Sequence, residues 1–280
     1  MSWVSYRYRG IEHVGLVDGD HYVPLAGIRR IDRSTGAHQL REAAPDARGR
    51  VPATETELLP PSWAPEKVFC VGLNYRDHIA ETGRDTPQYP VLFPKYADSL
   101  IAADQPIQLP AESQQVDYEG ELAVVIGAAG RRIPLDQAAQ HVLGYTVAND
   151  VTMRDYQYKT HQWVQGKAWD AVTPLGPYLV APADVDLDSA VIRTIVDGAT
   201  VQESDLGQLL FDIPMLISTI SEFTRLQPGD IILTGTPGGV GFRRKPALFL
   251  TPGATVSVEI DGIGRIDSAV VAEQVEGQAG

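Results

Sequence analysis

The sequence has almost no cysteine, no long apolar run and no excess of basic residues, and each absence excludes a class of protein. Cys70 is the only cysteine in 280 residues, which excludes an internal disulfide framework and a cysteine-based metal cluster. No apolar run approaches membrane-spanning length, and residues 1–6 lack the basic-then-apolar pattern of a signal peptide. We therefore expect a cytoplasmic protein with no membrane partner.

The charge balance narrows the range of partners. The formal net charge of −13 at pH 7 argues against nucleic acid as the main partner, because phosphate binding requires a basic face. An acidic chain also suits a site that concentrates cations. Cys70 itself lies in an apolar run, residues 68–71, which predicts a small buried side chain and not a nucleophile.

The pattern along the chain predicts an α+β fold in which strands dominate. Residues 1–62 read as a small N-terminal β-rich domain, with apolar runs on either side of a turn at residues 18–20. Residues 60–65 contain three prolines and predict a stiff boundary before a larger domain, residues 63–280. Later hairpin turns are predicted at Asp197-Gly198 and Asp261-Gly262.

Three helices are predicted among the strands. The first spans residues 74–83, with Asn74 as the cap at its start and Gly83 at its end. A helix this short orders mainly through packing or ligand contact, which is the behaviour expected of a lid. The other two span residues 135–142 and 213–226, and they are expected to end at Gly144 and at Pro228-Gly229.

One predicted strand, residues 116–126, carries a pair of carboxylates. Glu119 and Glu121 are two positions apart and therefore point to the same side of the strand. Two like charges at the mouth of a buried strand require a cation, a proton or open water. Carboxylate pairs suit hard cations such as Mg²⁺, Mn²⁺ or Ca²⁺. A solvated strand end explains the same spacing.

A third carboxylate ends another predicted strand, residues 145–150. If the two strands are neighbours, Asp150 converges with the glutamate pair, and the three could hold one Mg²⁺ with positions open for substrate. Alternatively, Asn149-Asp150 forms an ordinary turn. The polar and aromatic segment that follows, residues 151–170, predicts a binding surface beside the strands.

Three further side chains are candidates for catalysis. His78 and Glu81 share one face of their predicted helix, and an imidazole held by a carboxylate is a good general base near neutral pH. Lys167 could neutralise a developing oxyanion. Each of the three also fits an ordinary solvated surface.

The glycine-rich stretch at residues 235–241 matches neither a P-loop nor the dinucleotide fingerprint, so we predict a turn near a small ligand and no organic cofactor. The chain also lacks a Gly-x-Ser-x-Gly elbow, which argues against a serine hydrolase of that type.

Five sequence blocks occur in an order that closely resembles the fumarylacetoacetate hydrolase family. They are VGLNYRDH at 71–78, DYEGE at 117–121, GYTVANDV at 144–151, GKAWD at 166–170 and PGDIILTGTP at 228–237. The resemblance covers residues 65–270 and implies that family's mixed β-sandwich roll. Residues 1–60 resemble the small variable domain that precedes the catalytic domain in many bacterial members.

The resemblance also implies roles for individual residues. The metal ligands for Mg²⁺ or Mn²⁺, or Ca²⁺ in their place, would be Glu119, Glu121 and Asp150. The catalytic residues would be His78, Glu81 and Lys167, and the substrate contacts Tyr75, Arg154, Gln157 and Thr236. The chain departs from the family at residues 151–153, where relatives often have Ser-Ala before the arginine, and at Trp169, where Phe is usual. Both departures bear on substrate preference.

We therefore expect a metal-dependent hydrolase that cleaves a C–C bond in a small acylpyruvate-like acid through a metal-bound enolate. The same site suits oxaloacetate decarboxylation or tautomerisation, and isomerisation of a 2-hydroxyhepta-2,4-diene-1,7-dioate-type diacid. A non-catalytic metal- or ligand-binding protein is the option from another class. The resemblance further implies a small dicarboxylic or keto-acid substrate, a homodimer and a role in the catabolism of aromatic compounds.

Overall fold

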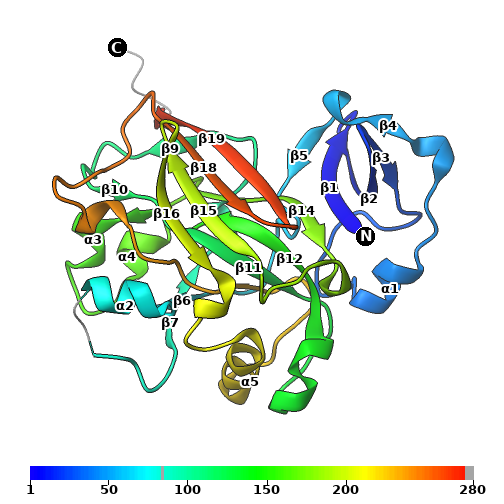
Figure 1. Ribbon diagram of the computed structural model, residues 1–280. Coiled ribbons are helices and arrows are strands. Elements are labelled where there is room, and N and C mark those ends of the chain that lie inside the picture. Colours follow the sequence, from blue (N-terminus) through cyan, green and yellow to red (C-terminus); the bar gives the residue numbers. More distant parts are fainter. Residues whose placement is uncertain (83–84, 275–280) are drawn as a thin grey trace.

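The computed structural model describes residues 1–82 and 85–274 and contains two main β-sheets (Figure 1). The large sheet has 12 strands, and its main path runs in the order β4 (Val51–Pro52), β3 (His21–Pro24), β2 (Ile11–Asp18), β1 (Ser2–Tyr8), β14 (Thr173–Val180), β12 (Val142–Asn149), β11 (Gly120–Ile126), β17 (Ile231–Leu233), β6 (Val68–Gly72) and β7 (Val91–Lys95). Off this path, β5 (Glu57–Leu59) pairs with β1, and β8 (Leu100–Ala102) pairs with β14.

The second sheet has five strands, in the order β16 (Ala199–Asp205), β15 (Val191–Val196), β18 (Thr255–Ile260), β19 (Gly264–Ala272) and β9 (Ile107–Leu109). A two-stranded ribbon joins β10 (Val116–Asp117) to β13 (Thr152–Met153). Parallel pairs such as β17 with β6 occur beside the antiparallel ones, so the sheets are mixed. The prediction of a strand-dominated α+β fold is confirmed.

The helices are short. The α-helices are α1 (Ala37–Glu42), α2 (Arg76–Thr82), α3 (Arg154–Gln157), α4 (Val164–Lys167) and α5 (Ile213–Phe223). The 3₁₀ helices are η1 (Ala47–Gly49), η2 (Ala53–Glu55), η3 (Ala97–Ser99), η4 (Leu135–His141), η5 (Pro182–Asp184), η6 (Leu206–Gln208) and η7 (Gly241–Arg243).

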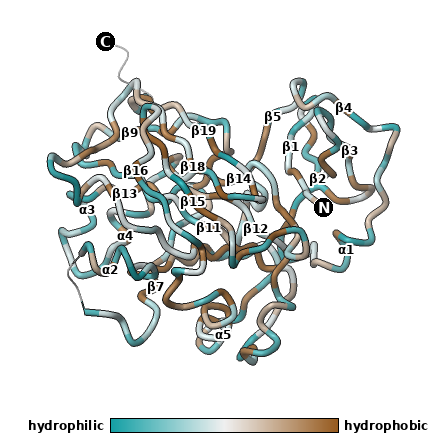
Figure 2. The backbone as a smooth tube through the Cα atoms, viewed as in Figure 1, coloured by the Kyte–Doolittle hydropathy of each residue, from teal (hydrophilic) through white to brown (hydrophobic). Residues whose placement is uncertain are grey.

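Strand β11 is buried along its whole length, and its two faces serve different layers. Leu122 and Val124 point into the core shared with the five-stranded sheet and with α5. Ala123, on the opposite face, packs in a smaller cluster with Cys70. Figure 2 shows apolar segments along the central strands and α5. Each large aliphatic side chain buried here contributes about 1.5–3 kcal/mol relative to exposure. Cys70 is fully buried, as its apolar neighbours predict.

The N-terminal strands extend the large sheet. Strand β1 pairs with β14, with Ser2 opposite Val180 and Trp3 opposite Leu179. Trp3 is buried in a cluster that also includes Leu143 of β12. The N-terminal unit, at the right of Figure 1, is therefore joined to the rest of the protein by both backbone pairing and apolar packing.

Local turn signals are right for the hairpins but wrong for two helix ends. Asp197-Gly198 and Asp261-Gly262 connect paired strands as predicted. Gly144, however, lies inside β12 opposite Val125, because strand pairing begins directly after η4. Helix α5 ends at Phe223, well before Pro228-Gly229, and the chain then pairs Leu226 with Gly130. Long-range pairing overrides the local stop signal in both cases.

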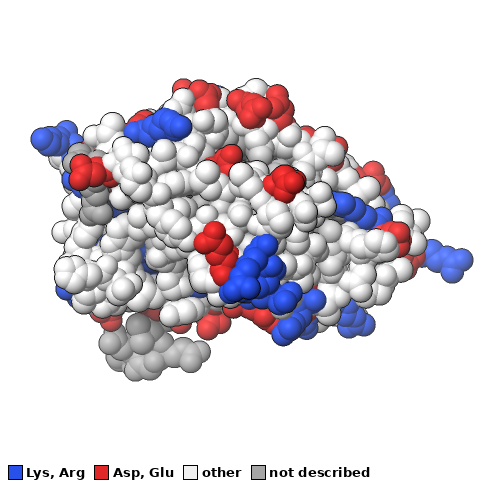
Figure 3. Space-filling model, turned by 90° about the horizontal axis from the view of Figure 1, so that it is seen from below, with Lys and Arg blue, Asp and Glu red and all other residues white. Residues whose placement is uncertain are grey.

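The surface carries many charges of both signs. On the face seen in Figure 3, basic side chains lie in small groups close to acidic ones. Among the described residues, no helix is long and apolar enough to cross a membrane.

Candidate metal centre

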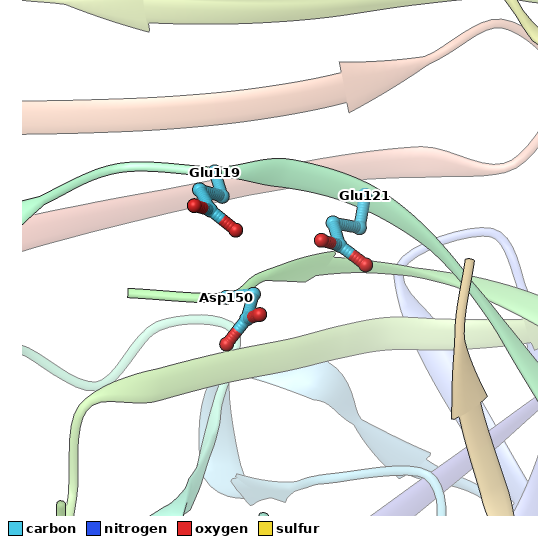
Figure 4. Close-up of side chains that lie close together, drawn as sticks. All are labelled: Glu119, Glu121 and Asp150. Carbon is cyan, nitrogen blue, oxygen red and sulfur yellow. The ribbon is translucent and has the colours of Figure 1, made fainter. Parts of the chain in front are cut away.

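Antiparallel pairing of β11 and β12 builds a cluster of three carboxylates. Gly120 is opposite Asn149, so Glu119 and Glu121 lie beside Asp150. One oxygen atom from each carboxylate lies within 4.8 Å of the other two, and all three residues are buried. In Figure 4, Glu121 projects from β11 toward the neighbouring strand β12, and Glu119 and Asp150 come from the residues directly beside these two strands. The strands are thus neighbours, as the sequence-based hypothesis of a convergent site requires.

Gly120 lets the glutamate strand lie tightly against the five-stranded sheet. A Cβ atom at this position would lie 2.3 Å from Oγ1 of Thr194 and 3.0 Å from Val258. The Gly120 carbonyl accepts a hydrogen bond from Oγ1 of Thr236 (2.9 Å), and its amide donates to Oε1 of Gln202 (3.1 Å). The backbone between the two glutamates is therefore fixed on that side.

Buried cations surround two of the three carboxylates. Lys167 Nζ donates to Glu119 Oε2 (2.6 Å) and to Asp150 Oδ2 (2.7 Å). Arg154 Nη2 lies 2.7 Å from Glu119 Oε1, and Lys95 Nζ lies 2.9 Å from Asp150 Oδ1. Glu119 and Asp150 are therefore each paired with two cations.

Glu121 differs from the other two ligands. Within residues 1–82 and 85–274 it has no cation paired with it, and its Oε2 accepts a hydrogen bond from the Gly235 amide (2.8 Å). Burial, followed by the charges of Asp150 and Glu119, raises its pKa well above the ordinary value. Burial also acts on Glu119, but Lys167 and Arg154 outweigh it and lower the pKa of Glu119 to about 2. Glu121 is thus the carboxylate whose negative charge lacks compensation.

The donor set fits a hard divalent cation. It consists of carboxylate oxygens alone, without thiolate or imidazole, which is the set that Mg²⁺ and Mn²⁺ prefer. The unpaired charge of Glu121 supplies a second argument, because a buried carboxylate without a cation is costly. Both observations make this cluster suitable for a metal.

A small cavity of about 40 Å³ lies over the cluster. Seven of the ten predicted site residues line it: His78, Glu119, Glu121, Arg154, Gln157, Lys167 and Thr236. The remaining wall includes Gly72, Phe93, Tyr158, Trp163 and Phe242. The polar segment predicted as a binding surface, residues 151–170, therefore contributes much of the wall.

Three predicted site residues lie away from the cavity wall. Asp150 lies behind it, with its carboxylate between two lysines. Glu81 lies behind His78, with its Oε2 3.2 Å from Nδ1 of the imidazole. Tyr75 is fully buried in the main hydrophobic core, where its hydroxyl has no hydrogen-bond partner among the described residues. The structure thus does not bring Tyr75 to the place where a substrate would bind.

The His78 imidazole is held at the edge of the cavity by α2. Glu81 contacts Nδ1 of His78, which leaves Nε2 for the cavity, and also accepts a hydrogen bond from the Gly239 amide (3.2 Å). Burial raises the pKa of Glu81, but these two hydrogen bonds outweigh it and lower the pKa below the ordinary value. Glu81 therefore remains a carboxylate that can orient the imidazole.

The segment before α2 is anchored differently from the prediction. Asn74 does not cap the helix, because its side chain is buried elsewhere. Its Nδ2 donates to the carbonyls of Phe211 (3.0 Å) and Thr234 (2.7 Å), and its Oδ1 accepts from the Phe211 amide (2.8 Å). Asn74 thus connects the segment before α2 to two others: Phe211, which precedes α5, and Thr234, which follows β17. Gly83, the predicted end of the helix, lies outside the described residues.

Arg154 is occupied by internal partners. Its Nε donates to Asp117 Oδ2 (2.8 Å), its Nη1 donates to Gln157 Oε1 (3.0 Å), and its Nη2 faces Glu119. Since the Gln157 oxygen is used by Arg154, the Gln157 amide nitrogen is the group left to donate to a ligand. Arg154 therefore aligns Glu119 and Gln157 along one side of the cavity.

Three buried polar residues of the site were missed by the sequence reasoning: Lys95, Asp117 and Gln202. Asp117 accepts hydrogen bonds from the amides of Gly241 (2.8 Å) and Phe242 (3.0 Å), and so ties the glycine-rich loop to the site. Lys95 could have been identified as the single charge at the end of an apolar extended run. Asp117 could have been identified because it precedes Glu119 by two positions and so lies on the same side of an extended chain. Gln202 has no comparable signal.

Comparison with known proteins places this site in a family. Residues 67–271 match the family described as fumarylacetoacetate (FAA) hydrolase C-terminal. The chain therefore belongs to the fumarylacetoacetate hydrolase family, whose members are enzymes.

The similar proteins are named for different activities. The chain is 41% identical over 263 residues to oxaloacetate tautomerase fahd2, mitochondrial, of Xenopus laevis, covering 91% of this chain and 82% of that protein. A fumarylacetoacetate hydrolase from Exiguobacterium antarcticum superposes with a TM-score of 0.86 at 33% identity, covering 98% of this chain and 100% of that one. A 5-carboxymethyl-2-hydroxymuconate delta-isomerase from Mycobacterium smegmatis gives a TM-score of 0.83 at 35% identity with the same coverage.

Proposed function

We propose that the protein is a divalent-metal-dependent enzyme that interconverts the keto and enol forms of a small 2-oxo dicarboxylic acid of the oxaloacetate type. The observation that carries the proposal is the buried carboxylate cluster under a cavity that also contains His78 and Lys167. The small cavity and the similarity to oxaloacetate tautomerases support a short substrate. This activity was an alternative in the sequence-based expectation, and the relatives favour it over C–C bond hydrolysis.

The pairing of charges in the site leaves one carboxylate for a metal. Asp117, Glu119 and Asp150 each pair with at least one of the cations Lys95, Arg154 and Lys167, whereas Glu121 pairs with none of them. A divalent ion held by Glu119, Glu121 and Asp150 would supply positive charge beside Glu121 and a Lewis acid that stabilises negative charge on neighbouring oxygens.

His78 is the residue suited to move the proton. In the keto-to-enol direction the C3–H bond breaks, its electron pair forms the C2=C3 double bond, and the C2 oxygen gains a proton. With Nδ1 directed at Glu81, the lone pair on Nε2 can accept the C3 proton. The same nitrogen can then deliver that proton to the C2 oxygen, which completes the enol, and the two transfers run in reverse in the enol-to-keto direction.

Lys167 stabilises charge and does not donate its proton. Burial lowers the pKa of Lys167, but Asp150 and Glu119 outweigh this effect and raise it above the ordinary value. The group therefore stays an ammonium throughout the reaction, where it can stabilise negative charge that develops on the substrate oxygen. The Gln157 amide nitrogen would donate a hydrogen bond to a substrate carboxylate, since its oxygen already accepts one from Arg154.

C–C bond hydrolysis is the second candidate, and one observation favours it. The His78–Glu81 pair can equally take a proton from water, and the cavity has room for about three water-sized positions. Water attack on a distal carbonyl would then cleave an acylpyruvate-like acid. The two candidates differ in their products.

The test is an assay of oxaloacetate and a panel of acylpyruvates with Mg²⁺, with Mn²⁺ and after chelation. We expect metal-dependent acceleration of oxaloacetate enol–keto interconversion, followed by ultraviolet absorbance of the enol, without loss of CO₂. His78→Ala should lower the rate about 100-fold or more. Cleavage of acylpyruvates without any acceleration of tautomerisation would refute the first candidate and support the second.

A further inference from the structure

A second cavity lies next to the one over the carboxylate cluster. Its volume is about 510 Å³, against about 40 Å³ for the inner cavity. Phe93, Tyr158 and Trp163 line both cavities, so these three side chains stand between them. A small inner cavity and a much larger outer cavity are therefore separated by aromatic side chains.

Trp163 is the tightly packed part of this wall. Its ring meets Phe93 edge-on, with centroids 5.5 Å apart and planes at 63°. A Cβ atom on Gly72 would lie 2.4 Å from Cζ3 of Trp163, so this side of the indole has room only for a glycine. Phe93 is itself buried and lies 4.9 Å from Nζ of Lys167, measured to the ring centroid. Tyr158, by contrast, is 45% exposed.

The proposed metal ligands and Lys167 belong to the inner cavity. Glu119, Glu121, Lys167 and Gln157 line that space and do not line the outer one. The outer cavity is bordered by Val91 and Leu92 and by the polar side chains of Thr160, His161 and Gln162. A 2-oxo acid would therefore place its head in the inner cavity, and a long tail directed to the outer one would run past the wall that contains Trp163.

We propose that Trp163 sets the chain length of the acid that the site accepts, closing the inner cavity so that short 2-oxo dicarboxylic acids bind and longer ones are excluded. This inference rests on the proposed function for the class of substrate. It assigns selectivity to Trp163 and not to Trp169, one of the two places at which the sequence analysis expects a departure from the family.

Trp169 provides a matched control. It lies on the same polar segment but lines neither cavity. Its ring packs edge-on against Tyr156, and its Nε1 donates to the Gln165 carbonyl (2.7 Å). Removing this indole deletes the same side-chain volume without opening the wall.

The experiment compares Trp163→Leu, Trp163→Phe and Trp169→Leu with the wild type. Binding of linear 2-oxo dicarboxylic acids of four, five and seven carbons is measured by calorimetry with Mg²⁺, and kcat/KM is measured for the same acids. In Trp163→Leu the preference for four over seven carbons should fall about 10-fold or more, since each methylene in a hydrophobic pocket is worth about 10–200-fold. Trp163→Phe should shift the ratio less, and Trp169→Leu should leave it unchanged.

An unchanged ratio in Trp163→Leu, or an equal shift in Trp169→Leu, would overturn the inference. If thermal unfolding shows that Trp163→Leu does not fold, the ratio in Trp163→Phe decides, and no shift there also overturns it. Absence of binding of every acid to the wild type overturns it as well. If Trp163→Leu binds longer acids better but no acid is turned over, the result supports the role of Trp163 in length selection and refutes the proposed reaction.

Discussion

Two networks of charged side chains in this protein have similar distances but opposite surroundings. In the site, Lys167 lies 2.6 Å from Glu119, and the two side chains are 2% and 7% exposed. On the outer face of the five-stranded sheet, Arg265 lies 2.6 Å from Glu259, and these side chains are 44% and 30% exposed. The outer network also includes Arg193, Glu203, Asp261 and Asp267.

The surroundings decide what each network contributes. An exposed ion pair contributes about 0–1 kcal/mol, because water already solvates both charges. A buried pair loses that hydration, and apolar residues of similar volume are often as stabilising or more so. The buried network is therefore poorly explained by stability. The proposed metal and anionic substrate would give these charges a function.

Removing one buried cation should give the largest effect on stability. Lys167→Met leaves Glu119 and Asp150 short of a positive charge in a dry environment, so the free energy of unfolding should fall by about 3–5 kcal/mol. Added Mg²⁺ should restore part of this loss, since the ion compensates the same carboxylates. Denaturant unfolding with and without Mg²⁺ measures both. If the free energy of unfolding fell by less than about 1 kcal/mol, the buried ion pairs would be no more important for stability than the exposed ones.

Removing the uncompensated carboxylate should separate function from stability. Glu121→Gln keeps an acceptor for the Gly235 amide but deletes a charge that burial and two neighbouring carboxylates disfavour. We expect the metal-free protein to melt at the same or a higher temperature, while Mn²⁺ binding is lost and activity falls about 100-fold or more, as a Lewis-acid effect of several kcal/mol implies. Unaltered Mn²⁺ affinity in calorimetry would show that the metal is held elsewhere.

A smaller effect is expected where the buried network meets the glycine-rich loop. Asp117→Asn places an amide group among the N–H donors of Arg154, Gly241 and Phe242, so at least one buried hydrogen bond is lost. The cost should be about 1–3 kcal/mol in unfolding free energy. Because the loop forms part of the cavity wall, KM should rise more than kcat falls. A larger fall in kcat than rise in KM, measured by steady-state kinetics, would contradict this role for the loop.

The exposed network should give the smallest effect. Arg265→Met removes partners of Glu259 and Asp267 that water can replace, so stability should change by about 0–1 kcal/mol and activity should not change. This variant is the control for Lys167→Met, since both convert a paired cation to methionine. A loss as large as that of the buried variant would show that exposure does not govern these energies.

Much of the site followed from short-range patterns. Alternation in extended chain predicts that Glu119 and Glu121 share a side, and the order of the five blocks links them to Asp150. The single strand predicted over residues 116–126 is wrong, because the chain breaks between β10 and β11 and leaves Glu119 just before β11. The helix pair of His78 and Glu81 likewise depends only on three-residue spacing. Such features could be predicted because they are set by neighbours in the chain.

The remainder depends on contacts between distant segments. Asn74 has the residue type of a helix cap, but it bonds to Phe211 and Thr234 instead. Gly144 has the residue type of a helix stop, but pairing with Val125 draws it into a strand. The oppositely charged partners of Lys95 and Asp117, which are Asp150 and Arg154, lie more than 35 positions away, so no local pattern identifies them.

The pairing of β1 with β14 has a consequence for how this protein can be divided. Without the N-terminal strands, β14 would present an unpaired edge at Leu179 and Val180, next to the apolar side chains that now cover Trp3. An exposed, apolar sheet edge is a template for intermolecular pairing. We therefore expect residues 63–280 expressed alone to aggregate more readily than the full chain, unless another segment covers this edge.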